Sequence, residues 1–221
     1  MRDVHQDAGA QAELDALGLE VLPVVVRGDR RLVVAHPQQL VEFFGLPPED
    51  RTAEWTDLVD AAERVLLAFE RLLTQLPEDR IHDPTPNRGR DMRNMTINVF
   101  GLMEELIHCM DSCQFSYQAH KDHDATYVEY ASVRQLREYA AQARERWVAR
   151  ARRVGPDEVD AYVTTDRKGD VTQYLALDSG ARHAAGHLRQ AYQFLRDIGI
   201  APMDELTVEQ MRPIQVQTSL Y

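Results

Sequence analysis

Apolar residues in the last three quarters of the chain recur every three or four positions, which is the spacing of one face of an α-helix. The pattern is clearest from 55 to 76, where neither proline nor glycine interrupts it. Three further stretches, at 90–115, 132–154 and 170–198, have the same helical character. Four helices of this length joined by loops predict a four-helix bundle, and therefore a mainly α protein.

The first fifty residues follow a different pattern. Short β-branched runs flank Gly28-Asp29, a dipeptide that favours a tight turn. The predicted elements come in the order helix, strand, strand, helix, at 8–17, 20–26, 32–35 and 37–44. We therefore expect a small α-β-β-α segment at 1–50 and a separate bundle domain at 51–221.

Composition narrows the class of protein. The chain has 221 residues, 44% of them hydrophobic, which is enough to bury a core. Its net charge of −11 disfavours binding to nucleic acid or to anionic membranes. No apolar run approaches the roughly 18 residues of a membrane span, and the N-terminus lacks a signal-peptide pattern. Two cysteines, four residues apart, give no disulfide framework, so we expect a cytoplasmic protein.

Eight histidines are the unusual feature of the composition. His183 and His187 are separated by four residues in the predicted fourth helix, so both rings lie on one helix face and can reach one metal ion. A buried histidine pair that only makes hydrogen bonds is the alternative. His108, in the apolar stretch L-I-H-C-M of the second helix, is the candidate third ligand. Of the others, His120 and His123 form a second cluster in a polar loop, favouring solvation, and three carry no signal.

Two polar residues near these histidines are candidate catalytic groups. Glu105 comes one turn before His108 and is a candidate base or orienting residue, with a buried ion pair to arginine as the alternative. Gln190 follows His187 by three residues, so its amide can reach the ring, or can serve as a helix contact. The arginine-rich third helix suggests a solvated face, or a grip on a substrate carboxylate.

The N-terminal run G-L-E-V-L-P-V-V-V-R-G-D-R resembles the C-terminal half of a glutaredoxin or thioredoxin-like domain over about residues 3–46. The resemblance implies a cis-proline loop at Leu22-Pro23 that binds the γ-glutamyl-cysteine part of a thiol. The unit that carries the redox cysteine in that family has no counterpart here, so redox catalysis by this segment is not expected. We expect the strand edges to be covered, either by the bundle or by a second subunit. We also expect a homo-oligomer such as a dimer.

The later part of the chain resembles the DinB-like (YfiT-like) metal-binding bundle superfamily. The match rests on H-x-x-x-H-L-R-Q-x-Y-x-x-L-R-x-x-G-I at 183–200 and covers about 52–203. It implies that His108, His183 and His187 bind a divalent metal, with zinc first, then nickel, iron or manganese. Members include thiol S-transferases that use bacillithiol or mycothiol, and a mycothiol-dependent isomerase.

The resulting functional hypothesis is a divalent-metal-dependent enzyme that activates a low-molecular-weight thiol as a thiolate, which attacks an electrophilic substrate. Two alternatives share the same site. One is a module that binds a metal and a ligand without converting them, and the other is a hydrolase that uses metal-bound hydroxide. Neither nucleic acid nor a membrane is an expected partner.

Overall fold

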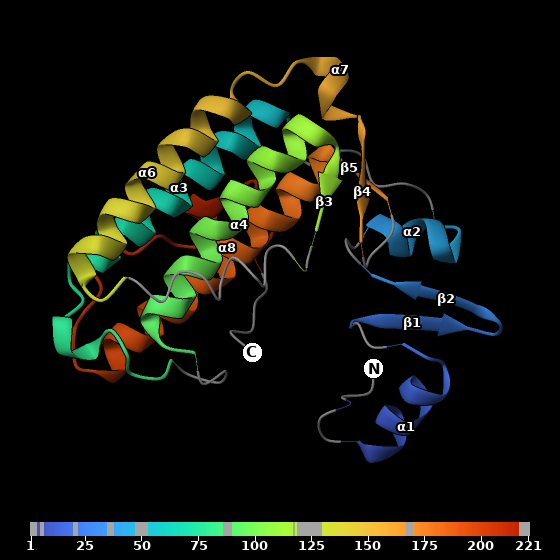
Figure 1. The fold of residues 1–221 in the computed structure, drawn as a ribbon, viewed down its shortest axis with the longest axis horizontal. Coiled ribbons are helices and arrows are strands. Elements are labelled where there is room, and N and C mark those ends of the chain that lie inside the picture. The colour runs from blue at the N-terminus through green and yellow to red at the C-terminus, as the bar shows by residue number, and fades with distance from the viewer. Residues whose placement is uncertain are drawn as a thin grey trace.

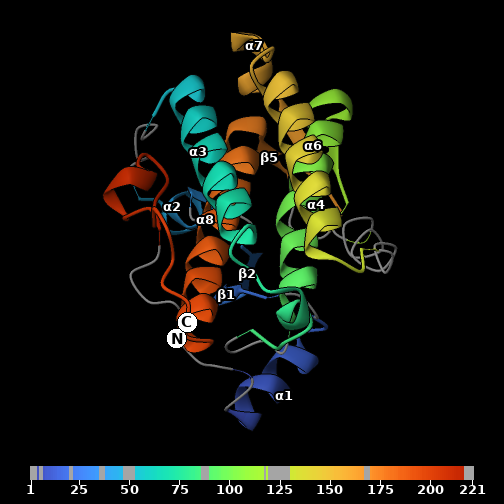
Figure 2. The ribbon, with the colours of Figure 1, turned by 90° about the vertical axis from the view of Figure 1, so that its left-hand side faces the viewer.

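The computed structural model describes residues 4, 7–19, 22–34, 38–46, 53–85, 90–116, 118, 130–166 and 170–216. Four long helices lie side by side (Figures 1 and 2). They are α3 (Trp55–Leu73), α4 (Met92–Ser112), α6 (Val133–Ala151) and α8 (Gln173–Asp197). Helices α3 and α4 each pack against both α6 and α8, so the bundle closes around one core. The predicted mainly α class and its four-helix bundle are confirmed.

Side-chain caps fix where three of these helices begin. Asp91 accepts a hydrogen bond from the backbone N–H of Asn94, Ser132 from that of Gln135, and Thr172 from that of Leu175. The predicted start of the fourth helix at 170 was too early, because Val171–Thr172 form strand β5 before the helix begins. Paired backbone groups of the strand are unavailable to a helix, and Thr172 then serves as the cap.

The core is closely packed where α4 meets its neighbours. Phe69 of α3 and Phe100 of α4 meet edge to face, with ring centroids 5.8 Å apart. Gly180 lies against α4 so closely that a Cβ there would sit 2.6 Å from Cδ1 of Leu106. Ala184 and Ala185, one turn on, are fully buried. These small residues let the two helices approach along the turns that carry the histidines.

A small sheet and three short helical segments complete the described residues from 53 onward. Strand β4 (Tyr162–Thr165) pairs in parallel with β3 (Gln114–Phe115) and antiparallel with β5 (Val171–Thr172). Helix α7 (Pro156–Val159) comes between α6 and β4. Of the two 3-10 turns, η1 (Glu78–Arg80) lies between α3 and α4, and η3 (Glu209–Met211) follows α8. Because β3 follows α4 and β5 leads into α8, the sheet lies at the bundle end opposite the start of α4 (Figure 1).

The N-terminal segment has the predicted order of elements: α1 (Ala8–Ala16), β1 (Val24–Arg27), β2 (Arg30–Val33) and α2 (Gln38–Phe44). The two strands form an antiparallel hairpin, and Gly28 takes a positive φ of 60° in its turn. Within the described residues β1 pairs with β2 alone. The domain boundary at residue 50 and the covering of these strands by a second subunit stay predictions.

Among the helices of the described residues, none combines the length and the apolar character needed to cross a membrane.

Candidate functional site

His183 and His187 lie against one another on α8. Their ring centroids are 4.4 Å apart and their planes are nearly perpendicular, at 82°. His187 is buried, with 6% of its surface exposed, and His183 is half-buried. The four-residue spacing puts both rings on the same face, and the packing of α8 against α4 turns that face inward. The predicted placement of both rings on one helix face is confirmed.

Asn98, which the sequence analysis did not select, is the residue of α4 that meets this pair. Its Oδ1 lies 2.8 Å from Nε2 of His183, and only 4% of the residue is exposed. It is flanked on both sides by the buried apolar side chains of Ile97 and Val99. A buried amide costs free energy unless it is hydrogen-bonded, so an asparagine inside the run M-T-I-N-V-F was the signal that could have identified it.

His187, the second ring of the pair, is in contact with Gln190 of its own helix. Nδ1 of His187 lies 2.8 Å from Oε1 of Gln190, one helical turn further along α8. A carbonyl oxygen only accepts hydrogen bonds, so Nδ1 carries the proton and Nε2 of the neutral ring keeps its lone pair. The contact with the ring expected for Gln190 is therefore present. A ring oriented in this way by an acceptor is typical of a metal-binding histidine.

His108 does not face the pair, contrary to the prediction. It is exposed, and its Nε2 lies 3.3 Å from Oγ of Ser112 in its own helix. Helices α4 and α8 are antiparallel, since Gly180 packs on Leu106 while His183 meets Asn98. His108 comes ten residues after Asn98, which is about 15 Å along the helix axis. Most of the apolar residues around His108 are buried, but His108 itself lies on the exposed face of the helix, so the prediction from its neighbours was wrong.

In the described ranges, no three histidine, cysteine or acidic side chains lie close enough together to hold a metal ion. The donors that do converge are two imidazoles and one amide oxygen, from His183, His187 and Asn98. Two imidazoles on one helix face can supply two nitrogen donors to a divalent ion, while the Asn98 amide oxygen accepts a hydrogen bond from Nε2 of His183. The candidate site is therefore this triplet, in place of the three predicted histidines.

Glu105 lies in the same part of α4 as His108. It is half-buried and comes seven residues after Asn98, or about 10 Å along the axis. The neighbouring Glu104 makes the polar contacts instead: the hydroxyl of Tyr139 donates to its Oε2 over 3.1 Å, and Arg146 forms an ion pair with it. Glu104 is thus tied to α6, and the role of Glu105 stays a prediction.

The arginines of α6 join helices together. Three ion pairs have a nitrogen–oxygen distance of 2.6 Å: Nε of Arg144 to Oε1 of Glu70, Nε of Arg150 to Oδ1 of Asp111, and Nη2 of Arg152 to Oε2 of Glu63. These partners belong to α3 and α4, so the arginine run forms a set of ion pairs between neighbouring helices. This observation favours neither of the two interpretations drawn from the sequence, a solvated face or a grip on a substrate.

The two cysteines differ in environment. Cys109 is buried with Phe115, Val163 and Val171, and burial raises the pKa of its thiol from 9.0 to about 12. Cys113 is exposed and ends α4 in the left-handed conformation, with φ 57°. Cys109 therefore packs as a small apolar group.

The remaining candidates lie away from the triplet or outside the described residues. The peptide bond between Leu22 and Pro23 is cis, as expected for the loop, and both residues are exposed. Their role in thiol binding stays a prediction. His82 lies 3.2 Å from Asp91 at the start of α4. Four histidines fall outside the described residues: His5, His36, His120 and His123.

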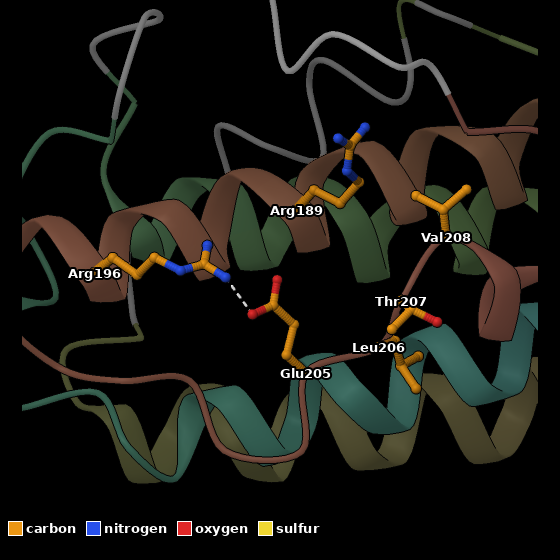
Figure 3. A pocket seen from close by; sticks show the side chains of 6 residues that line it. All are labelled: Arg189, Arg196, Glu205, Leu206, Thr207 and Val208. Carbon is orange, nitrogen blue, oxygen red and sulfur yellow. Dashed lines mark hydrogen bonds and ion pairs between the residues drawn. The ribbon is translucent and has the colours of Figure 1, made fainter.

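A separate hollow of about 280 Å³ lies on another face of α8 (Figure 3). It is bordered by α8 and by residues 205–208, and Arg196 crosses it to pair with Glu205. The guanidinium of Arg189 points away from Glu205. Arg189 comes two residues after His187, a rotation of about 200°, so this hollow and the histidine pair lie on opposite faces of α8.

Comparison with known proteins shows the fold. No model of a known family and no curated protein matches the sequence. The crystal structure of mycothiol-dependent maleylpyruvate isomerase matches with a TM-score of 0.52 and 15% identity, over 67% of this chain and 62% of that one. A mutant of that isomerase, with one histidine changed to alanine, matches with a TM-score of 0.54 and 15% identity, over 63% and 61%. The chain thus spans about three fifths of the length of these structures, and the match supports the predicted fold, a mainly α four-helix bundle.

Proposed function

We propose that the protein is a divalent-metal-dependent enzyme that uses a low-molecular-weight thiol, in a transfer or an isomerisation reaction. The observation that carries the proposal is the buried contact between His183 and His187, with Asn98 and Gln190 holding one ring each. The likeness in fold to an isomerase described as mycothiol-dependent supports the choice of a thiol. Because fold does not fix function, the reaction rests on the site.

The residues of the triplet fit a divalent ion. Nε2 of His187 carries the lone pair needed for a metal bond, because Gln190 accepts the proton on Nδ1. His183 offers its ring four residues earlier on the same face, and Oδ1 of Asn98 on α4 orients that ring by accepting a hydrogen bond from its Nε2. When bound, such an ion lowers the pKa of a coordinated thiol or water and so makes a nucleophile available at neutral pH.

The protein's own side chains supply orientation in this proposal. Gln190 fixes the tautomer and the plane of His187, and Asn98 restrains His183 from the facing helix. Ala184 and Ala185, between the two histidines on α8, let α4 pack closely against the pair. This close packing limits the access of water to the site. In the thiol reaction, the S–H bond breaks and its proton passes to solvent or buffer, while the sulfur forms a bond to an electrophilic carbon of the substrate. In a transfer reaction that carbon releases a leaving group with its bonding electrons, and in an isomerisation the π bond of a conjugated double bond opens and forms again when the thiol leaves.

The experiment that tests the function combines metal removal with a paired assay. The purified chain is freed of metal with a chelator, then assayed with mycothiol and maleylpyruvate, and with mycothiol and a chromogenic electrophile. Turnover should vanish on removal of the metal and return on addition of Mn²⁺, Co²⁺ or Zn²⁺. The His187→Ala variant should stay inactive with every metal.

Three results would contradict the proposal or redirect it. Full thiol-dependent turnover by His187→Ala would show that the histidine pair is not the active site. Metal-dependent hydrolysis of esters or amides in the absence of any thiol would instead assign metal-bound hydroxide as the nucleophile. Metal binding measured by calorimetry, with no turnover of either kind, would identify a binding module.

A further inference from the structure

Cys113 lies where the end of α4, strand β4 and the start of α8 meet. Its backbone N–H donates to the carbonyl of Cys109 over 2.9 Å, and its own carbonyl accepts from the N–H of Thr164 over 2.9 Å. The residue is exposed, and its Sγ lies 3.7 Å from Nε2 of Gln173, the first residue of α8. The backbone therefore holds this sulfur in a fixed place while solvent can reach it.

Gln173 carries a polar atom that its surroundings leave unsatisfied. Only 3% of the residue is exposed, and its Oε1 is buried without a hydrogen-bond partner among the described residues. A buried acceptor without a donor costs the desolvation of that group, which an apolar side chain would avoid. The same amide donates to Sγ of Cys113 through Nε2, so the side chain is aimed at the sulfur. An unmet acceptor beside an accessible thiol indicates a ligand that brings an N–H group to this sulfur.

The reach of the amide defines the class of ligand. The two polar atoms of an amide are about 2.2 Å apart, so Oε1 of Gln173 lies within about 6 Å of Sγ of Cys113. The last torsion of a glutamine side chain is broad and roughly two-fold, so a half turn brings Oε1 to the side of the sulfur. A small cysteine joined to Sγ by a disulfide of about 2.05 Å has its α-nitrogen four bonds away, within hydrogen-bond reach of that oxygen. An acylated nitrogen offers its N–H without a charge, which buried surroundings disfavour.

From these contacts we infer that Cys113 is a site of reversible S-thiolation by the disulfide of an N-acylated cysteine, and that Gln173 binds the amide N–H of the incoming group. The site is separate from the histidine pair, because Gln173 comes ten residues before His183 on α8, about 15 Å along the axis. The inference therefore stands or falls independently of the proposed function.

The step is a thiol–disulfide exchange. The Cys113 thiol loses its proton to solvent, and its sulfur attacks one sulfur of the small disulfide. A new S–S bond forms as the old one breaks, so the Cys113 sulfur is oxidised while the released sulfur is reduced and takes up a proton. Cys109 cannot displace the attached group at neutral pH, because burial raises the pKa of its thiol to about 12 and keeps it protonated. The mixed disulfide should therefore persist until an external thiol removes it.

A matched pair of disulfides tests the inference. N,N′-Diacetylcystine and 3,3′-dithiodipropionic acid carry the same carboxylates and differ only by the acetamido group that holds the N–H. Each is added to the full chain with Cys109→Ala, which leaves Cys113 as the one thiol, and the adduct is followed by mass spectrometry. The same chain unfolded in urea gives the intrinsic rates of the two reagents. Relative to these rates, the folded chain should favour diacetylcystine by at least about 5-fold, the effect of one hydrogen bond.

Substitutions locate the source of this preference. Gln173→Leu should return the ratio of the two rates to that of the unfolded chain, because it removes the amide while keeping similar bulk. Gln114→Leu is the matched control, since Gln114 is an exposed glutamine next to Cys113, and it should keep the preference. Circular dichroism shows whether each variant is folded, and Gln173→Met replaces Gln173→Leu if the latter does not fold.

Several results would overturn the inference. Equal relative rates for the two disulfides in the folded chain with native Gln173 would do so, as would a preference that survives in Gln173→Leu. His187→Ala should form the adduct as fast as the chain with the native histidine, and its loss of thiol-dependent turnover bears on the proposed function alone. Adduct formation that depends on His187 would instead place the ligand at the histidine pair and remove the separate site at Cys113.

Discussion

Within one helix, α4, Asn98 lies inside the bundle against His183, whereas His108 lies on the surface beside Ser112. Both residues stand in apolar stretches of the sequence, and the histidine has the more familiar ligand chemistry. Ten residues separate them, which places them about 15 Å apart along the axis and about 80° apart around it. The comparison teaches that a side chain joins a site when its turn of the helix packs against the neighbouring helix, here α8. Position in the packing matters more than residue type.

The largest expected effect separates His183, which contacts Asn98 inside the bundle, from His108 on the surface. His183→Ala should lower metal affinity and thiol-dependent kcat/KM by at least about 100-fold, because it removes one of two imidazole donors. His108→Ala should change either quantity by less than about twofold and should leave stability within about 0.5 kcal/mol. Calorimetry, steady-state kinetics and denaturation check these values. Equal losses in the two variants would restore His108 to the site.

A smaller effect is expected from the residue that orients His187. Gln190→Leu removes the acceptor for the proton on Nδ1 while keeping similar bulk. Metal affinity should fall by about 10-fold to 100-fold, as for other partners that orient a ligand. Gln193→Leu is the control, since Gln193 bonds to Asp197 on the exposed side of the same helix. An unchanged affinity for the Gln190 variant would show that packing alone orients the ring.

Next in size is a change in the contact that aligns the two helices. Gly180→Val adds a branched side chain where even a Cβ would lie 2.6 Å from Leu106. We expect a loss of about 1–3 kcal/mol in the free energy of unfolding from overpacking, measured by urea denaturation. The added bulk should also move Asn98 away from His183 and so weaken metal binding. A variant as stable as the native chain would show that Leu106 turns aside easily.

The smallest functional effect concerns the cysteines at the far end of α4. At pH 8, iodoacetamide should label exposed Cys113 in the native protein and leave Cys109 unmodified, because burial raises the pKa of the Cys109 thiol to about 12. Mass spectrometry after digestion identifies the labelled residue. Metal binding should be unaffected, since neither cysteine belongs to the triplet. Rapid labelling of Cys109 would show that this end of the bundle opens readily.

The same pKa predicts the direction of one pH effect on stability. The unfolded thiol ionises near pH 9, whereas the buried Cys109 stays protonated until about pH 12. The folded state therefore binds more protons in this interval, and its stability falls as the pH rises from 9 towards 12. Cys109→Ala should show a shallower fall over the same range in urea denaturation.

Much of the fold followed from local patterns. Helical periodicity located α3, α4, α6 and α8 to within a few residues, and Ser132 caps α6 as its residue type predicts. The order of the N-terminal elements and the cis peptide bond at Pro23 were likewise expected from short motifs. The start of α8 was missed because a two-residue strand is too short to show a periodic pattern, and Val171–Thr172 is defined only by its pairing with Tyr162–Val163.

The candidate site was predicted only in part. The four-residue spacing of His183 and His187 places them on one face of any helix, so this half of the site is a local property. Gln190 reaches His187 for the same reason. Asn98 and His108 could not be ranked without knowing how α4 is rotated and shifted along α8.

The sequence by itself determined the mainly α class, the four-helix pattern and the pairing of two histidines on α8, because each depends on intervals of three or four residues. Only the tertiary structure decided which residue of α4 completes the site. That choice depends on the antiparallel packing of two helices whose contacting residues are 85 positions apart, fixed by contacts such as Gly180 with Leu106. Helix periodicity repeats at every turn and so carries no information on which turns of two helices meet.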